Sequence, residues 1–583
     1  MRRVTRMDVA IDSPPERRST GKRPTVACIL DEFSMQAWGE AFDLLPVSPM
    51  GWRSELAARR VQLLFVESAW CGNSNQWQYQ LTGSQAPSAS LRELIAHCRD
   101  QGIPTVFWNK EDPPHFEDFL ETASLFDQVF TTDANKIDDY RERLGHDRVG
   151  VLPFAAAEHI HNPARLRRGH QQGDVAFAGT YFAHKFPERR EQMDILLGGA
   201  LDATPRQERG LDIFSRFQGV DARYDFPGPL GERVVGTLDY SDMLLAYKAY
   251  KLFLNVNSVI DSPSMCARRI FEIVACGTPV LSTDSAAIRQ FFSEDEVPIA
   301  RTREEAQHLV RALCNSSELR DRLVHRAQRT VWREHTYRRR AQQVLDAVGL
   351  DAEPLTAPKV TALVSTNRPR QMDHVLHSVG RQAGVEVQLA LVTHGFGVDE
   401  CELRRRAEDA GVTDLVVAEM PASVPLGACL RAAVTMADGD VLTKMDDDDL
   451  YGDEYLADLL HALHYSGASV VGKQAHYMYL SRFDATLLRF AHREHRWTDM
   501  VMGPTITGYA DVFRETPFAD LATGEDSDFL RRVSDSGAGI YSADRFNFVQ
   551  MRRGEHTWTA NDIELLATGS VTQFGDATEH VVF

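Results

Sequence analysis

The sequence predicts an α/β protein in which two Rossmann-like domains are followed by a separate α/β domain. Short apolar runs recur along the chain, and a helix-length segment follows almost every one. Residues 349–359 interrupt this alternation with two prolines and little periodicity, which is typical of a linker. The length of 583 residues also exceeds what one hydrophobic core usually organises. Several domains are therefore expected.

The first two series of apolar runs predict buried parallel strands, because the runs are apolar on both faces. The first series comprises 25–30, 61–67, 103–108 and 128–132. The second comprises 174–179, 252–257 and 279–282, with helices expected near 187–198, 241–250 and 267–276. We assign one Rossmann-like domain to residues 25–165. The next is assigned to 166–348 and ends in a charged helical stretch from about 318 to 348.

A third series lies beyond the linker, in residues 360–583. Its apolar runs are 360–366, 387–393, 414–419 and 440–445, each separated from the next by about one helix. After Asp453, four leucines recur with the spacing of a helix that buries one face: Leu456, Leu459, Leu460 and Leu463. This series predicts the separate α/β domain.

The composition limits the classes of partner. The chain is 43% hydrophobic and 25% charged, near the globular average, so folded cores are expected. Asp and Glu number 83 against 64 Lys and Arg, which gives a formal charge of −19. Because this charge repels phosphate backbones and anionic membranes, no nucleic-acid partner is expected. An acidic excess is compatible with metal-dependent binding of anionic substrates.

The cysteines and the N-terminal residues indicate the compartment. The eight cysteines contain no C-x-x-C pair, so neither a disulfide scaffold nor a zinc site is expected, and a reducing cytoplasm fits best. No transmembrane segment is expected, because no apolar stretch reaches the roughly 18 residues that such a helix needs. Residues 1–24 are rich in arginine without the apolar core of a signal peptide, which predicts a mobile basic tail. Peripheral contact of this tail with an anionic membrane is an open alternative.

Four consecutive carboxylates, Asp446 to Asp449, follow the apolar run 440–445. Such close like charges repel unless a cation or hydrogen-bond donors compensate, and ligands bind at the carboxyl ends of strands in open α/β sheets. One carboxylate of an Asp-x-Asp pair can hold Mg²⁺ or Mn²⁺, which bridges the phosphates of a nucleotide-sugar and stabilises the leaving diphosphate. The alternative is an exposed acidic turn that caps the next helix. The spacing of a calcium-binding loop is not met.

A second carboxylate group, Glu525, Asp526 and Asp528, stands just before a predicted helix. A carboxylate at a helix start is partly held ionised by the helix dipole and can accept a proton from a hydroxyl. Taken alone, such a group is more often a helix cap. Together with the first acidic cluster, it favours a catalytic base.

Residues 360 to about 560 resemble the family-two-like GT-A glycosyltransferases. The segment 363-LVSTNRP-369 resembles their nucleotide-binding strand, 446-DDDD-449 their D-x-D metal motif and 524-GEDSDFLRR-532 their catalytic-base motif. The resemblance implies that Asp446 contacts the nucleoside, that Asp448 ligates Mn²⁺ or Mg²⁺, and that Asp526 is the base of an inverting displacement. It further implies a donor-side or catalytic place for Thr366, Asn367, Arg368, Asp447 and Glu525.

Two departures from this family pattern concern base binding and processivity. The turn 392-VTHGFG-397 stands where the family often has an acidic residue, which leaves open how the nucleotide base is held. The segment 550-QMRRGEHTW-558 contains Gln550-x-x-Arg553 without the adjoining Trp of processive synthases, so a non-processive enzyme is expected. His556 is a further candidate metal or diphosphate ligand; the alternative is a surface or core histidine.

The segment 265-MCARRIFEIVACGTPVLST-283 carries a separate signal. Arg268 and Arg269 begin a predicted helix, and Glu272 lies one turn later. Backbone N–H groups at a helix start, with arginines beside them, can bind a diphosphate, and Glu272 can accept hydrogen bonds from ribose hydroxyls. By itself, the arrangement is also ordinary α/β structure.

Residues 25 to about 350 resemble GT-B glycosyltransferases, most closely the group typified by the spore maturation protein CgeB, through 176–190 and 252–282. This resemblance implies a donor site between two Rossmann domains. It would be lined by Gly179, Thr180, Arg268, Arg269 and Glu272. The family's E-x7-E pattern would need a glutamate where this chain has Ser264. Whether this half transfers a sugar or serves as an acceptor-binding or scaffolding module is therefore open.

Together these features predict a cytoplasmic two-module glycosyltransferase that uses nucleotide-diphosphate sugars. The acceptor would be a glycan, a lipid-linked glycan or a protein. One alternative is a single-activity GT-A enzyme whose GT-B-like half is a non-catalytic acceptor-binding scaffold. A binding protein without catalysis, and a nucleotidyl or phosphoryl transferase, are further alternatives. Release of a nucleoside diphosphate, and not of pyrophosphate, distinguishes glycosyl transfer from the last of these.

Overall fold

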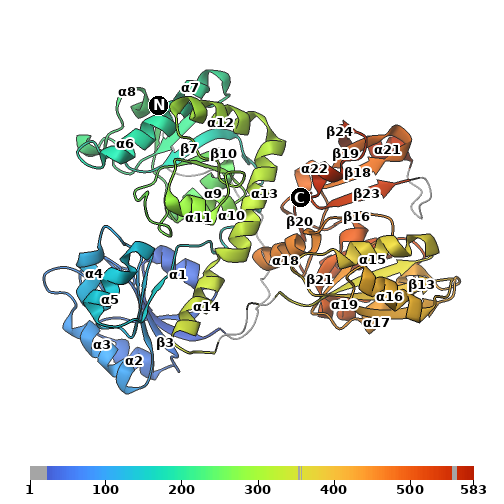
Figure 1. Ribbon diagram of the computed structural model, residues 1–583, viewed down its shortest axis with the longest axis horizontal. Helices are drawn as coiled ribbons and strands as arrows, with labels where there is room; N and C mark the ends of the chain where they lie inside the picture. The colour runs from blue at the N-terminus through green and yellow to red at the C-terminus, as the bar shows by residue number, and fades with distance from the viewer. Residues whose placement is uncertain (1–22, 352–354, 356, 554–560) are drawn as a thin grey trace. The chain divides into compact units, whose positions relative to one another are not determined.

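The computed structural model describes residues 23–351, 355, 357–553 and 561–583. The described chain forms two compact units, unit 1 up to Leu355 and unit 2 beyond it (Figure 1). Most of the predicted basic tail 1–24 and the candidate ligand His556 lie outside the described residues. None of the described helices is both long and apolar enough to cross a membrane.

Unit 1 begins with a six-stranded parallel sheet of order β2-β1-β3-β4-β5-β6. Its strands are β1 (Thr25–Ile29), β2 (Asp43–Pro46), β3 (Leu63–Glu67), β4 (Thr105–Asn109), β5 (Gln128–Thr131) and β6 (Val149–Val151). The connecting helices are α1 (Glu32–Trp38), α2 (Trp52–Ala57), α3 (Ala89–Asp100), α4 (Phe116–Ala123) and α5 (Ile137–Leu144). The sequence predicted the four central strands, whereas β2 and β6 are edge strands too short to show a pattern.

A second parallel sheet in unit 1 has the order β11-β10-β7-β8-β9. Its strands are β7 (Gly173–Ala178), β8 (Leu211–Phe214), β9 (Val234–Gly236), β10 (Tyr250–Asn255) and β11 (Val280–Ser282). Its helices are α6 (Pro187–Met193), α7 (Gly199–Ala203), α8 (Gly228–Gly231), α9 (Tyr240–Ala249), α10 (Arg269–Ala275), α11 (Ala286–Phe291), α12 (Arg303–Asn315) and α13 (Ser317–Glu334). Unit 1 thus contains two Rossmann-like sheets.

The charged stretch expected as continuous helix from about 318 to 348 is divided in two. Helix α13 ends at Glu334, and α14 (Tyr337–Ala347) begins after Thr336, whose extended backbone and side chain cap the new helix by accepting from the backbone of Arg339. At this break Thr336 pairs with Ala156, and the ring of Tyr337 lies 5.0 Å from Trp38 of the first domain. The interruption allows α14 to pack on the first sheet domain.

Unit 2 is built on an eight-stranded mixed sheet of order β14-β13-β12-β15-β21-β17-β22-β20. The strands are β12 (Val360–Thr366), β13 (Val387–His394), β14 (Asp414–Met420), β15 (Val441–Lys444), β17 (Val470–Gly472), β20 (Arg496–Thr498), β21 (Thr507–Tyr509) and β22 (Ile540–Ser542). The helices are α15 (Met372–Gly380), α16 (Glu400–Asp409), α17 (Leu426–Met436), α18 (Tyr455–Ser466), α19 (Ala510–Glu515) and α20 (Glu525–Asp535). The four predicted strands, β12 to β15, pair with one another in parallel.

A second sheet of unit 2 was not predicted from the sequence. It comprises β16 (Leu450–Tyr451), β18 (His476–Leu480), β19 (Ala485–Arg489), β23 (Phe548–Arg552) and β24 (Gly569–Phe574), accompanied by α21 (Asp562–Leu566) and α22 (Thr578–Val581). Strand β18 pairs with the distant β23, so the pairing depends on the folded core and not on a local turn.

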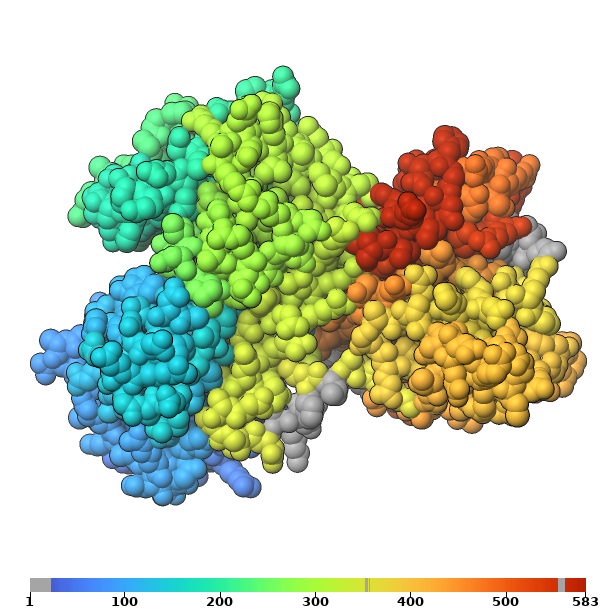
Figure 2. Space-filling view, in the orientation of Figure 1, coloured from blue at the N-terminus to red at the C-terminus, as the bar shows by residue number. Residues whose placement is uncertain are grey.

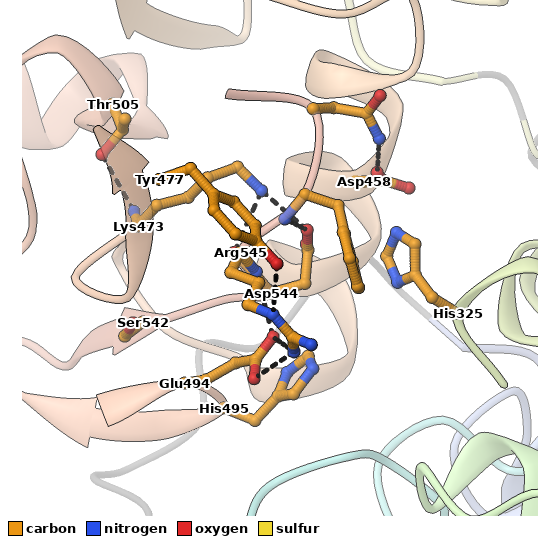
Figure 3. Close-up of polar contacts among 12 residues, drawn as sticks. His325, Asp458, Lys473, Tyr477, Glu494, His495, Thr505, Ser542, Asp544 and Arg545 are labelled. Carbon is orange, nitrogen blue, oxygen red and sulfur yellow. Dashed lines mark hydrogen bonds and ion pairs between the residues drawn. The ribbon is translucent and has the colours of Figure 1, made fainter. Parts of the chain in front are cut away.

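Buried ion pairs join the segments of unit 2 between its two sheets (Figure 3). Lys473 donates to Asp544 over 2.8 Å. Arg545 donates to Glu494 over 2.9 Å and to the hydroxyl of Tyr477 over 3.1 Å. Because a buried charge is costly without a partner, each of these pairs fixes the segments that carry it.

Candidate active sites

Unit 1 contains a cavity of about 1040 Å³ that residues of both its domains line. Figure 2 shows the surface of these domains, the first in blue to cyan and the second in green. The cationic side chains in the lining are Lys136, Lys185, Arg189, Arg216, Arg268 and Arg269, against the acidic Glu188 and Asp261. In a chain with a formal charge of −19, this local excess of positive charge favours an anionic ligand.

Four of the residues predicted for the donor site of this unit line the cavity. Gly179 and Thr180 follow the carboxyl end of β7, and Arg268 and Arg269 stand at the start of α10. A Cβ atom on Gly179 would lie 2.7 Å from the ring of Phe177, so the chain passes too close for a larger residue. The guanidinium of Arg269 donates to the carbonyl of Ala178 and thereby ties α10 to this strand end.

Glu272, the fifth predicted residue, lies behind the cavity wall. It is buried and accepts hydrogen bonds from the hydroxyls of Tyr240 over 3.1 Å and Tyr247 over 3.2 Å, and from the guanidinium of Arg268. Burial by itself would raise the pKa of Glu272, but the charge of Arg268 holds that pKa below its ordinary value. Tyr240, Tyr247 and Arg268 all line the cavity, so Glu272 orients side chains that face the cavity.

Ser264 stands where the family pattern would need a glutamate. Its hydroxyl donates to the carbonyl of Thr132 and accepts from the backbone N–H of Ala134, each over 2.8 Å. Both partners belong to the first domain of unit 1. The serine therefore joins the two domains at this position.

Arg189 is a cavity residue that the sequence analysis missed. Its guanidinium donates to the hydroxyl of Ser258, while its Nε has no hydrogen-bond partner among the described residues. Burial, together with the charge of Arg269, lowers the pKa of Arg189 to about 10. A desolvated guanidinium beside a second one is well placed for a phosphate. Its position in the first turn of α6, after Pro187, is the signal that could have identified it.

The candidate site of unit 2 forms where three chain segments meet. The parallel strands β12 and β15 are neighbours, and their carboxyl ends carry residues 366–368 and 446–449. The third segment is the first turn of α20, which contains Glu525 and Asp526. The fold thus brings the two predicted carboxylate motifs together at one edge of the sheet.

Arg368 neutralises part of the acidic cluster. Its guanidinium donates to Asp447 over 3.1 Å and to Asp448 over 2.8 Å. The hydroxyl of Thr366 also donates to Asp447, which is 4% exposed. Asn367 is exposed between them. Asp447 is consequently occupied by protein donors, whereas Asp448 is the more accessible carboxylate.

Lys444 connects the two carboxylate motifs. Its ammonium lies 2.7 Å from Oδ1 of Asp446 and 3.1 Å from Oδ2 of Asp526. The other oxygen of Asp526, Oδ1, is buried and has no hydrogen-bond partner in the described chain. Lys444 was not among the site residues predicted from the sequence.

Burial changes the proton affinity of the carboxyls at this site. It raises the pKa of Glu525 to about 7, and the neighbouring charge of Asp526 adds to the effect. The pKa of Asp526 is also raised by burial, against the opposing charge of Lys444. Carboxylates with raised pKa values bind protons more readily near neutral pH, as a general base requires.

Asp449 has a structural role within the acidic cluster. One of its oxygens accepts from the backbone N–H of Met551 over 2.9 Å, and its backbone carbonyl contacts His374 over 2.7 Å. Burial raises its pKa well above the ordinary value. Asp449 thus holds the turn against β23, and Asp446 and Asp448 are left as the more exposed members.

The carboxylates of this site fit a divalent cation whose remaining ligands are waters or substrate phosphates. In the described part of the chain, the carboxylates of this cluster do not bring three ligand atoms within 4.8 Å of one another. Mg²⁺ needs only one or two carboxylates when waters and substrate phosphates complete its coordination. Asp448, with a 15% exposed side chain, offers such an oxygen.

The end of β13 adds two polar groups that the sequence analysis did not nominate. The hydroxyl of Thr393 and Nε2 of His394 are buried and have no hydrogen-bond partner among the described residues. Thr393 lies opposite Thr366 on β12. These atoms belong to the turn 392–397, which replaces the family's acidic residue, so they are candidates for contacting a nucleotide base.

Comparison with known sequences supports the predicted enzyme class. Residues 186–346, which contain α10 and much of the cavity wall, match a family model described as glycosyl transferase-like. This match to part of the chain agrees with the predicted glycosyltransferase class. No curated protein matches the chain.

Two solved structures similar to part of the chain are complexes with nucleotide-sugars. TarS of S. aureus, residues 1–349 with UDP-GlcNAc, has 18% identity and a TM-score of 0.27, over 35% of this chain and 61% of TarS. The mannosyltransferase PcManGT of Pyrobaculum calidifontis, with GDP-Man and Mn²⁺, has 20% identity and a TM-score of 0.30, over 36% of this chain and 61% of that protein. The chain thus spans about 61% of each of these two structures. Similarity at this level leaves the chemistry to be argued from the residues.

Proposed function

We propose that the chain is a two-module glycosyltransferase that transfers sugars from nucleotide-diphosphate sugars to a glycan, lipid-linked or protein acceptor. Unit 2 is a GT-A-like module with inverting chemistry, and unit 1 is a GT-B-like pair of domains of the CgeB type. The observation that carries the proposal is that Asp446 and Asp526 meet at Lys444, although about 80 residues separate the two motifs.

In unit 2, Asp526 is the proposed catalytic base. The acceptor hydroxyl gives its proton to Oδ1 of Asp526, while its oxygen bonds to the anomeric carbon of the donor. The bond from that carbon to the diphosphate breaks at the same time, and its electron pair leaves with the diphosphate. Asp446 contacts the nucleoside of the donor.

A divalent cation fits the same module. Asp448 would hold Mn²⁺ or Mg²⁺ on the donor side, and the ion would stabilise the charge of the leaving diphosphate. Arg368 donates to Asp448 over 2.8 Å and so limits the orientations of this carboxylate. The titles of TarS and PcManGT name UDP-GlcNAc and GDP-Man, which are suitable first donors to test.

In unit 1, the cationic cavity is the proposed site of a second nucleotide-diphosphate donor. Arg189, Arg268 and Arg269 would contact the diphosphate. Their guanidinium groups would then supply the positive charge that the metal ion supplies in unit 2. Gly179 and Thr180 bring the backbone close to it. If this half does not catalyse, the same cavity supports the alternative of an acceptor-binding scaffold.

The first experiment tests the metal assignment in unit 2. The full chain is incubated with a panel of UDP- and GDP-sugars and Mn²⁺, and release of nucleoside diphosphate is measured. We expect Asp448→Ala to lower the metal-dependent rate by about 100-fold, because one positioned ion typically contributes several kcal/mol to such a transition state. Asp438→Ala is the control, since this aspartate of unit 2 is 57% exposed and pairs with Lys359.

An unchanged rate in Asp448→Ala would show that the metal assignment is wrong. Release of pyrophosphate in place of a nucleoside diphosphate would overturn glycosyl transfer itself.

Residues 25–165 and 166–348 are proposed as the domains of unit 1, with 349–359 as linker and 360–583 as the GT-A-like module.

A further inference from the structure

Lys444 is a buried cation at the centre of the acidic site of unit 2, and no motif assigns it a role. It is the last residue of β15 and is 4% exposed. Its ammonium contacts Asp446, on the donor side, and Asp526, the proposed base, over 2.7 and 3.1 Å. One side chain therefore joins the two carboxylate motifs.

We propose that Lys444 is a positioning residue that holds the carboxylate of Asp526 with its free oxygen toward the acceptor. This inference rests on the proposed function of unit 2. Lys444 donates to Oδ2 of Asp526, and the backbone at Gly503 closes the same side, since a Cβ atom there would lie 2.0 Å from Oδ2. Oδ2 thus contacts Lys444 and lies close to the backbone at Gly503.

The second oxygen of Asp526 differs from the first. Oδ1 is buried and accepts no hydrogen bond from the described residues. A buried carboxylate oxygen without a donor is costly, so a bound hydroxyl would be its natural partner. With Oδ2 held by Lys444, the carboxylate cannot rotate freely, and Oδ1 keeps one direction.

The ammonium also links the base to the donor side of the site. An ammonium group has three N–H donors, and the two contacts to Asp446 and Asp526 leave its nitrogen fixed between them. Asp446 is the residue proposed to contact the nucleoside. The position of the base is thereby set by the same group that orients the donor-side aspartate.

A double-mutant cycle in the full chain tests this role. Lys444→Met should lower kcat for release of nucleoside diphosphate by about 10- to 100-fold, because the base is no longer oriented. KM for the donor should change less than kcat does, since Asp446 itself remains in the variant while the proposed base loses the ammonium that holds it. Lys444→Arg should recover part of kcat. In an Asp526→Asn background, Lys444→Met should have no further effect, since the group it positions is gone.

Lys473→Met is the matched control. Lys473 is as buried as Lys444 and forms an ion pair with Asp544 (Figure 3). Its substitution should lower the unfolding temperature, and any loss of kcat should be the same with and without Asp526→Asn. If Lys444→Met does not fold, Lys444→Gln keeps a donor of similar length without the charge and takes its place.

Two results would overturn the inference. One is a wild-type kcat in both Lys444→Met and Lys444→Gln. The other is a loss that multiplies with that of Asp526→Asn, as an independent structural effect would. If the wild-type chain releases no nucleoside diphosphate from any UDP- or GDP-sugar, the proposed function itself fails and the role of Lys444 falls with it.

Discussion

Glu272 and Asp526 are both acidic motif residues, but their surroundings give them different roles. Both oxygens of Glu272 receive hydrogen bonds from side chains that line the cavity, so this residue acts through Arg268 and two tyrosines. Asp526 has one oxygen held by Lys444 and one without a partner among the described residues. A carboxylate that can take a new hydrogen bond is suited to proton transfer, and one already saturated is suited to orientation.

Glu525 should make stability depend on pH. The folded chain keeps its proton up to about pH 7, whereas the ordinary pKa of a glutamate here is 4.5. Between these values the folded state binds more protons, so the free energy of unfolding falls as pH rises. Relative to Glu525→Gln, we expect the wild-type chain to lose about 1–3 kcal/mol between pH 5 and 8. Urea unfolding at both pH values measures this, and parallel pH curves for the two proteins would contradict it.

At the scale of elements, the site of unit 2 depends on a close approach between a turn and a helix. The turn Gly503–Thr505 precedes β21 and lies against the first turn of α20, where Asp526 stands. Glycine is required because the carboxylate occupies the space that a Cβ atom would take. The turn therefore limits where the base can lie.

Gly503→Ala should disturb the base without unfolding the protein. Its Cβ would lie 2.0 Å from Oδ2 of Asp526, so the carboxylate must move away from Lys444. Because the displaced atom ends a side chain, we expect the unfolding midpoint to change little and kcat to fall about 10-fold or more. Initial rates of nucleoside diphosphate release and thermal unfolding of the same preparation measure both. A wild-type kcat in this variant would show that the turn does not hold the base.

At the scale of the whole molecule, the two compact units carry two chemically different candidate sites. The cavity of unit 1 is lined by arginines and lysines, and the site of unit 2 is built from carboxylates. A cationic site can bind a diphosphate directly, whereas an acidic site needs a metal ion to do so. Two activities in one chain would raise the local concentration of the first product at the second site.

Two variants separate these activities. Glu272→Ala leaves Arg268 without its buried carboxylate, and Asp526→Asn removes the proposed base. We expect each variant to lower one of two products by at least about 10-fold and to spare the other. Products from the donor panel are identified by mass, with Glu188→Ala, an exposed acid of the same cavity, as control. Loss of the same single product in both variants would favour one active site and a scaffolding unit 1.

The sequence predicted β1, β3, β4 and β5 of the first sheet, β7, β10 and β11 of the second, and β12 to β15 of unit 2, because continuous apolar runs such as 25–30 and 360–366 reflect burial on both faces. The interior strands β8, β17 and β21 were missed. Short edge strands such as β2 and β9, and the second sheet of unit 2, were not predicted. Their residues carry little pattern, since neighbouring strands supply the pairing that makes them extended. The break at Thr336 was missed for a related reason: helical periodicity continues on both sides of it.

By itself, the sequence determined the α/β class, the two acidic motifs and the arginine pair, because each is a local pattern of burial or charge. Only the tertiary structure decided which of these groups meet. In unit 2, Lys444 precedes the first acidic motif and contacts both motifs. In unit 1, the predicted Glu272 lies behind the wall of the cavity, whereas Arg189, from another helix, lines the cavity. Such contacts depend on which strand ends and helix starts the folded core brings to one edge, and no local pattern encodes that distance.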